Sequence, residues 1–238
     1  MTGESGGMSK TAILAFFIAM SAASSAGAVD RTLSVTTFDK IRIDGPYKVK
    51  LTTGVSPFAK VSGSPAAIDG VSVDQQGGTL VVRGNPSTWG GYPGQGRGPV
   101  EISVGTQTLS AVWINGPGSL AVDKIKGLSF DLSVQGSGSA AVANANVDQL
   151  KIAISGVGSV SIAGTAPRLT AIVRGTSSLD ASALAVKDAT VGAEGPAQVR
   201  LTATNSAKID ARGVSTVDVS GGAACTVTTQ GSAVISGC

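Results

Sequence analysis

A short glycine-centred phrase recurs along this chain at a nearly constant interval. It reads INGPGSLAV from residue 114, VQGSGSAAV from residue 134 and ISGVGSVSI from residue 154. With the first glycine of each phrase as a marker, the successive intervals are 20, 20, 19, 20, 18 and 18 residues, for the markers Gly116, Gly136, Gly156, Gly175, Gly195, Gly213 and Gly231. A repeat of this length indicates structural units that stack on one another.

Apolar residues flank the first six of these markers with a period of two. They stand two and four residues before it and four and six residues after it, as in Val112, Ile114, Leu120 and Val122 around Gly116. This alternation is typical of β-strands and lacks the i, i+3, i+4, i+7 spacing of a helix. The 33 glycines and the small share of aromatic residues, 4%, agree with short strands and tight turns.

Each unit therefore contains two short strands joined at a glycine corner. Because every unit repeats the same strands in the same order, successive units must lie parallel. The sequence predicts an all-β fold, a single-stranded parallel β-helix (solenoid) with coils of about 20 residues. A nucleotide-binding glycine loop is excluded, since such a loop occurs once and precedes a helix.

Two sets of charged residues test the register of this stacking. Immediately before three consecutive markers stand Arg174, Glu194 and Arg212, and five residues after them stand Asp180, Arg200 and Asp218. Strands spaced by about 4.8 Å would place each residue beside its counterpart in the next coil. The signs alternate in both sets, so we predict structural charge ladders on the outer surface.

The same pattern extends toward the N-terminus. Gly45 has apolar neighbours on both sides at the same offsets, and Gly63 and Gly84 have them on the leading side. After Gly84 the apolar residue expected at position 88 appears as Val100. We therefore predict a corner insertion over residues 85–99 within a single β-helix domain that spans residues 29–238.

Residues 1–28 have the features of a secretory signal peptide. Lys10 precedes the apolar run 12–20, and small residues end in an A-x-A pattern at Ala26–Ala28. The run is too short to span a bilayer, and no integral membrane segment is expected in the mature chain. Net charge is only +3 and the basic residues are dispersed, which disfavours nucleic acid as a partner.

The two cysteines, Cys225 and Cys238, both lie in the predicted mature chain. In an exported protein such a pair usually forms a disulfide. We predict a disulfide that staples the C-terminal end, residues 225–238. A metal or redox pair is the weaker interpretation, because the chain has no C-x-x-C motif and no histidine.

The predicted insertion contains the best candidates for a binding site. Trp89, Tyr92 and Arg97 stand among glycines and prolines there, and Trp113 lies in the outward phase of its strand. Aromatic faces beside a guanidinium commonly bind sugars or protein surfaces. The alternative is that Trp89 folds back as a hydrophobic cover over the corner, with Trp113 beneath the loop. No catalytic constellation, metal site or cofactor site is predicted.

One stretch and three later motifs resemble a known family. FDKIRIDGPYKVKL at 38–51, TLVV at 79–82, VEISV at 100–104 and INGPGS at 114–119 are similar to the head GIN domain, a family of exported bacterial domains labelled auto-transporter adhesins. The resemblance covers about residues 38–220. It implies a right-handed β-helix and a location in the cell envelope, periplasmic, at the cell surface or secreted. No site residue can be transferred from it.

The glycine repeat, the predicted signal peptide and the family resemblance together favour an exported envelope protein without catalytic activity. Such a protein would act as an adhesin-like or scaffolding module. Its expected partner is a glycan or a protein surface of the envelope. The alternative is a carbohydrate-active β-helical protein that binds or cleaves a polysaccharide near the 85–99 loop.

Overall fold

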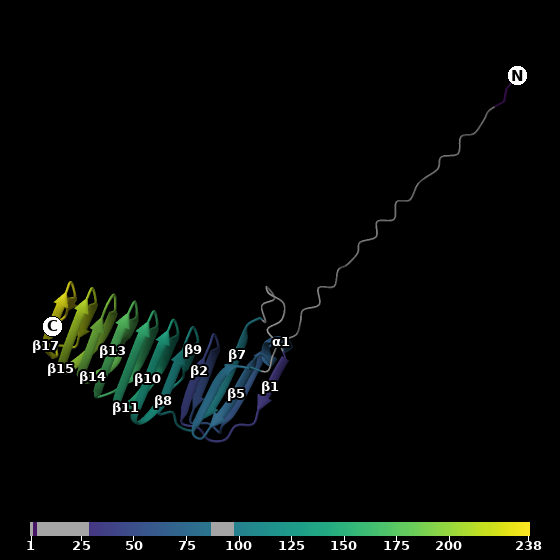
Figure 1. Cartoon of the computed structure of the whole chain (residues 1–238), viewed down its shortest axis with the longest axis horizontal. Helices are drawn as coiled ribbons and strands as arrows, with labels where there is room; N and C mark the ends of the chain where they lie inside the picture. The colour runs from purple at the N-terminus through teal and green to yellow at the C-terminus, as the bar shows by residue number, and fades with distance from the viewer. Residues whose placement is uncertain (1, 4–28, 87–97) are drawn as a thin grey trace.

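The computed structural model describes residues 2–3, 29–86 and 98–238. The chain forms a β-solenoid of about six turns with coils of roughly 20 residues, as the repeat predicted. Figure 1 shows the strands stacked along the long axis, with β17 at one end and β1, β5 and α1 at the other. The predicted leader, residues 1–28, lies outside the described residues apart from Thr2 and Gly3.

The regular part of the stack begins after residue 110. Its strands are β8 (Ala111–Asn115), β9 (Ser119–Val122), β10 (Ile125–Gly136), β11 (Ser139–Gly156), β12 (Ser159–Thr165), β13 (Arg168–Gly175), β14 (Ser178–Glu194), β15 (Gln198–Gly213), β16 (Thr216–Ser220), β17 (Ala224–Gly231) and β18 (Val234–Ser236). Each pairs in parallel with its equivalent in the next coil.

Two outer walls follow from this pairing. Wall A contains the strand segments that precede the marker glycines, such as β8 and residues 130–134 and 150–154. Wall B contains the segments that follow them, such as β9 and residues 139–142 and 159–162. Their inward residues stack in register: Ile114, Val134 and Ile154 are neighbours, each at most 1% exposed. Burial of each such side chain stabilises the fold by about 1.5–3 kcal/mol.

The marker glycines form the corner between the two walls. All eight of them, including Gly45, have positive φ, between 81° and 115°. A Cβ added to Gly156 would lie 2.6 Å from the carbonyl oxygen of Gly136. The corner therefore needs glycine for its backbone conformation and for the close approach of the neighbouring coil.

The structure adds a third, short segment to each coil that the sequence pattern did not show. In one coil it buries Ala145 and Val147 between the two walls. It also absorbs the differences in coil length: from Val142 to Leu150 is eight residues, whereas from Leu201 to Ala207 is six. Register shifts occur at this segment, and both walls stay in register on either side of it.

Both predicted charge ladders have the expected register. Arg174, Glu194 and Arg212 are successive strand partners, as are Asp180, Arg200 and Asp218. Arg174 pairs with Glu194 at 3.1 Å and Arg200 with Asp218 at 3.9 Å. Arg212 instead pairs at 2.9 Å with Asp210 of its own strand. These pairs are exposed and so contribute little energy each.

The N-terminal part is less regular than predicted. Its elements are β1 (Val29–Leu33), β2 (Lys40–Asp44), β3 (Lys48–Thr53), β4 (Phe58–Gly63), α1 (Pro65–Asp69), β5 (Val71–Gln76), β6 (Thr79–Gly84) and β7 (Val100–Thr106). β2 and β3 form one parallel coil beside β8 and β9. β6 and β7 then lie on the outer side of that coil, although they follow it in sequence.

Antiparallel strands extend both walls at this end. β5 pairs with β6 on wall A, and β4 and β1 continue wall B beyond β7. Gly63 and Gly84, which the sequence pattern grouped with the corner glycines, are not such corners: Gly63 ends an antiparallel strand, and neither glycine has positive φ. The apolar alternation around Gly63 was misleading because antiparallel and parallel strands share a period of two.

The predicted insertion joins β6 on wall A to β7 on wall B, the transition that Gly45 makes in the neighbouring coil. The wall resumes two residues later than predicted, since Ile102, and not Val100, lies opposite Val49. At the root of the segment, Asn85 donates a hydrogen bond from its backbone N–H to the carbonyl of Gly70, at 3.0 Å.

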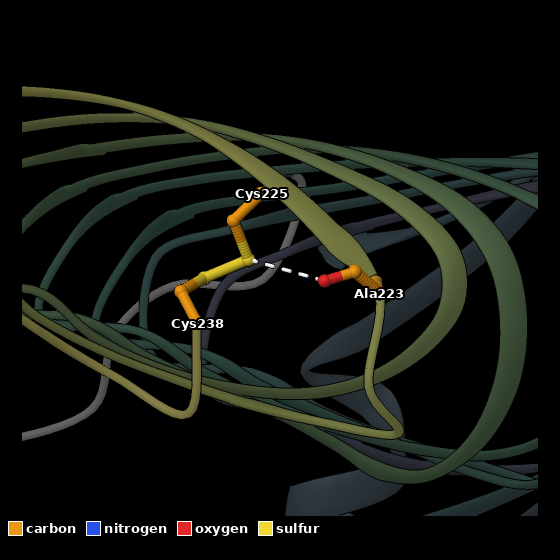
Figure 2. The surroundings of a disulfide bond; sticks show 3 residues. All are labelled: Ala223, Cys225 and Cys238. Carbon is orange, nitrogen blue, oxygen red and sulfur yellow. Dashed lines mark hydrogen bonds between the residues drawn. A yellow bond between two sulfur atoms is a disulfide. The ribbon is translucent and has the colours of Figure 1, made fainter.

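A disulfide joins Cys225 and Cys238, as predicted, with a Cα–Cα distance of 5.6 Å. Cys225 is the strand partner of the buried Ala207 and packs against the core. Figure 2 shows the bridge crossing from β17 to the segment that follows β18. The bridge therefore ties together opposite sides of the last coil.

Candidate binding site

Trp113 is the central feature of the outer face of wall A. It points outward from β8, between Arg42 of β2 and Ser133 of β10. Its neighbours on the same strand, Val112 and Ile114, are fully buried, whereas Trp113 is 36% exposed. Period-two alternation alone fixes this direction, because the flanking apolar residues must face the core.

A polar hollow of about 600 Å³ lies on the N-terminal side of Trp113. Arg42 donates a hydrogen bond from Nε to Oδ1 of Asp44 at 3.0 Å. Asn115 donates from Nδ2 to the same oxygen at 2.6 Å. Asp44 therefore holds an arginine and an amide in fixed positions, on strands adjacent in the wall and remote in the sequence.

A second ion pair borders this hollow. Arg83, which lines it, donates from Nη2 to Oδ2 of Asp74 at 2.9 Å. Hydrogen bonds from Ser72 and then from Arg83 lower the pKa of Asp74 below its ordinary value. The carboxylate therefore stays ionised and its arginine stays paired at neutral pH. Gln76, Thr79 and Gln135 add further hydrogen-bonding groups to the lining.

An apolar hollow of about 260 Å³ lies on the other side of Trp113. Along the row of outward residues, Trp113 is followed by Ser133, Ala153 and Ile172 on successive strands. The two small side chains leave a depression between two large ones, and Ile172 is 43% exposed. Asp131 and Lys151, which are strand partners, line one side of the depression.

Wall B has a hollow of about 460 Å³, but of a different kind. Serines 119, 139 and 159 line it as strand partners in three coils, with Lys48 at one end and Asp180 at the other. None of the described residues that line it is aromatic. Wall A is therefore the better candidate surface, since ligand sites combine an apolar contact area with a few fixed polar groups.

The structure places only one of the four predicted binding residues. Trp89, Tyr92 and Arg97 lie outside the described residues, so their predicted role stays a prediction. Trp113 lines both hollows on wall A. The predicted disulfide residues belong to the last coil and take no part in this surface.

Sequence reasoning missed the polar partners of Trp113. Arg42, Asp44, Arg83 and Asn115 come from three strands, and only the pairing of β2 with both β6 and β8 brings them together. Their alternation with buried apolar residues showed that these side chains point outward. It did not show that they lie together, because that depends on the order of the strands, which does not follow the sequence.

The described residues contain neither a metal-binding cluster nor a membrane-spanning helix. Within residues 29–86 and 98–238, no three cysteine, aspartate or glutamate side chains gather in a way that could hold a metal ion. In the same residues, no helix is long and apolar enough to cross a membrane.

Comparisons with known proteins agree on the fold. A "putative adhesin" from Bacteroides fragilis superposes with a TM-score of 0.78 at 18% identity, covering 89% of this chain and 97% of that one. A "putative lipid binding protein" from Parabacteroides distasonis gives 0.66 at 16% identity, with the same coverages. A "putative adhesin" from Parabacteroides merdae gives 0.65 at 17%, covering 89% and 96%. These likenesses show the fold alone.

No curated protein matches the chain. The family model described as "Putative auto-transporter adhesin, head GIN domain" matches residues 37–223, close to the range 38–220 over which the sequence resembles that family. The β-solenoid, its corner glycines and this match over most of the chain lead to one conclusion: the protein belongs to the head GIN domain family.

Proposed function

We propose that the protein is an exported, non-catalytic adhesin-like module that binds an envelope component through the outer face of wall A. The observation that carries this proposal is Trp113, a 36% exposed indole between a polar and an apolar hollow. An exposed aromatic side chain on a rigid sheet loses little conformational entropy on binding and offers a large contact area. The family description supports an adhesin-like role.

A binding role accounts for the charged groups better than catalysis does. Several acidic residues on the outer faces are engaged by basic partners: Asp44 by Arg42, Asp74 by Arg83 and Glu194 by Arg174. Polysaccharide hydrolysis requires two carboxyl groups with different protonation states on either side of one bond. Paired, ionised carboxylates serve instead to hold hydrogen-bond donors in place.

Binding of the exported full-length product to an immobilised bacterial cell-envelope fraction tests the proposal. We expect Trp113→Ser to weaken binding about tenfold or more, since an aromatic anchor at the centre of an interface carries much of its energy. Ser133 occupies the same outward position on the next strand, so a serine there is compatible with the wall.

Leu128→Ser is the matched control. Leu128 is 78% exposed on β10 and lines neither hollow, so its loss should not change binding. Reducing ends should not increase when the protein is incubated with envelope polysaccharide. Equal binding by the Trp113→Ser variant, or release of reducing ends, would contradict the proposal.

A further inference from the structure

The two hollows beside Trp113 form one extended surface across the strands of wall A. The row of residues in the outward phase runs through Val81, which is buried, and then Arg42, Trp113, Ser133, Ala153 and Ile172, on six successive strands. Five strand spacings correspond to about 24 Å along the stack. Trp113 stands near the middle of this length, with the polar hollow toward Val81 and the apolar hollow toward Ile172.

The charges along this surface balance one another. Arg42 is paired with Asp44 inside the polar hollow, and Arg83, which lines the hollow, is paired with Asp74 at its border, so each guanidinium group has a carboxylate partner. On the apolar side, Asp131 and Lys151 are strand partners of opposite sign. An anionic ligand would find no excess positive charge here and would have to compete with each aspartate for its arginine. The surface therefore favours a ligand without net charge.

The combination of groups specifies the kind of uncharged ligand. The guanidinium groups, the Asn115 side chain and the Gln76 and Gln135 amides present many donors and acceptors within one hollow, which suits a ligand rich in hydroxyl groups. The indole and the small side chains of Ser133 and Ala153 suit flat apolar faces. A pyranose ring has both properties, hydroxyl groups around its edge and C–H bonds on its faces.

We infer that wall A binds a neutral oligosaccharide, laid along the stack with one sugar ring on Trp113 and its hydroxyl groups in the polar hollow. The inference rests on the proposed function and names the ligand class for that same surface. The length of the row allows several consecutive sugars to contact the wall, so a hexasaccharide binds more tightly than a disaccharide of the same units.

The first experiment applies the exported protein to an array that contains neutral, carboxylated and sulfated glycans. Binding confined to neutral glycans is expected, followed by calorimetric titration with the best neutral hexasaccharide. Trp113→Ser should weaken that titration about tenfold or more, and Trp113→Tyr, which keeps an aromatic face, should stay within about threefold of the natural protein. Leu128→Ser should match the natural protein, and circular dichroism establishes that each variant is folded.

A second variant tests the charge argument separately. Asp44→Asn keeps the shape of the side chain but leaves Arg42 without its carboxylate partner. We expect this variant to gain binding of hexagalacturonate, an anionic probe, and the gain to disappear at high salt. Binding of hexagalacturonate by the natural protein as tightly as of the neutral hexasaccharide would overturn the inference.

The outcomes separate this inference from the proposed function. If no neutral glycan binds while Trp113→Ser still weakens adhesion to the envelope fraction, the ligand class is wrong and the surface is right. Binding to phosphatidylglycerol vesicles that depends on Trp113 would also overturn the glycan assignment, in favour of a lipid. If adhesion does not depend on Trp113, both proposals fail.

Discussion

The two ends of this solenoid use one period-two alternation of apolar residues in different ways. From β8 onward every strand pairs in parallel with its equivalent in the next coil, and the chain advances along the stack in sequence order. Before β8, the strands β6 and β7 lie on the outer side of β2 and β3 although they follow them in sequence. Antiparallel strands then extend wall A and wall B. The regular part repeats one two-walled coil, whereas the N-terminal part combines parallel and antiparallel strands in an order that does not follow the sequence.

The candidate site lies where these two parts meet. Arg42, Asp44 and Arg83 come from the irregular part, and Trp113 and Asn115 from the first regular coil. A repeating unit tends to place similar residues side by side, as with the serines of wall B. The junction brings dissimilar residues together, which a binding site with both apolar and polar contacts requires. Chemical variety on this surface therefore comes from departures from the repeat.

Loss of the disulfide should have the largest effect among the changes that test this comparison. The bridge closes a segment with a sequence separation of 13. In the chain-entropy model Cys225→Ser with Cys238→Ser lowers the free energy of unfolding by about 3 kcal/mol. Hydrogen exchange should show β17 and β18 losing protection first, with amides of β2 and β6 at the other end unchanged. Uniform loss of protection along the stack would show that the coils are not independent.

Corner glycines should respond differently in the two parts. Gly156→Ala should destabilise the fold by about 2 kcal/mol, because φ is +112° and the added Cβ would lie 2.6 Å from the Gly136 carbonyl oxygen. Gly84→Ala is the matched change in the N-terminal part, where φ is not positive and the nearest atom is the Tyr47 hydroxyl at 3.4 Å. Urea denaturation should show a clear loss only for Gly156→Ala. Equal losses would remove the structural distinction between these two positions.

Reversal of one charge in the ladder should have a smaller effect. Glu194→Arg would set three arginines in adjacent coils, in place of a pair with Arg174 at 3.1 Å. Because these side chains are about 60% exposed, we expect a loss of at most about 1 kcal/mol at low salt, and less at high salt. Glu194→Gln separates the lost attraction from the new repulsion, and thermal unfolding at two salt concentrations measures both. A loss that does not depend on salt would argue against an electrostatic cause.

The smallest expected effect is that of acid. Hydrogen bonds from Ser206 and Asn205 lower the pKa of Asp188, and those from Ser182 lower the pKa of Asp180. Since the folded-state pKa is below the unfolded value, the stabilisation is present above about pH 4 and disappears as pH falls through the folded pKa. The melting temperature should therefore fall between pH 5 and pH 3.

Asp188→Asn should make this fall shallower, because one of the groups responsible no longer titrates. Asp30 and Asp74 in the N-terminal part also have lowered pKa values, through bonds from Lys60 and Ser72 respectively. The acid effect should therefore be shared by both parts, in contrast to the effects of the disulfide and of the corner glycine. An unchanged slope in Asp188→Asn would contradict this origin.

The regular coils could be predicted from the sequence because each position recurs. The spacing of the glycines and apolar residues established strand direction, corners and register, and the structure bears out the register of both charge ladders. The third segment could not be predicted because the interval across it, from wall B to wall A, varies between six and eight residues and so shows no fixed offset. The order β6, β2, β8 could not be predicted, since these parallel strands share one apolar alternation, which does not tell which of them are neighbours.

For the site, the sequence supplied Trp113 and its outward direction but not its partners. Asp44 and Asn115 are 71 residues apart and meet only through the pairing of β2 with β8. The right-handed sense of the coil and the boundaries of the leader and the domain stay predictions.

The variable third side of each coil has a consequence for how such a protein can change. Because length differences are taken up there, a whole additional turn could be spliced into the regular part without disturbing the faces already present. Each added turn would move the disulfide-bound tip about 4.8 Å further from the tryptophan surface. The length of the solenoid and the chemistry of the Trp113 surface can therefore change independently in evolution.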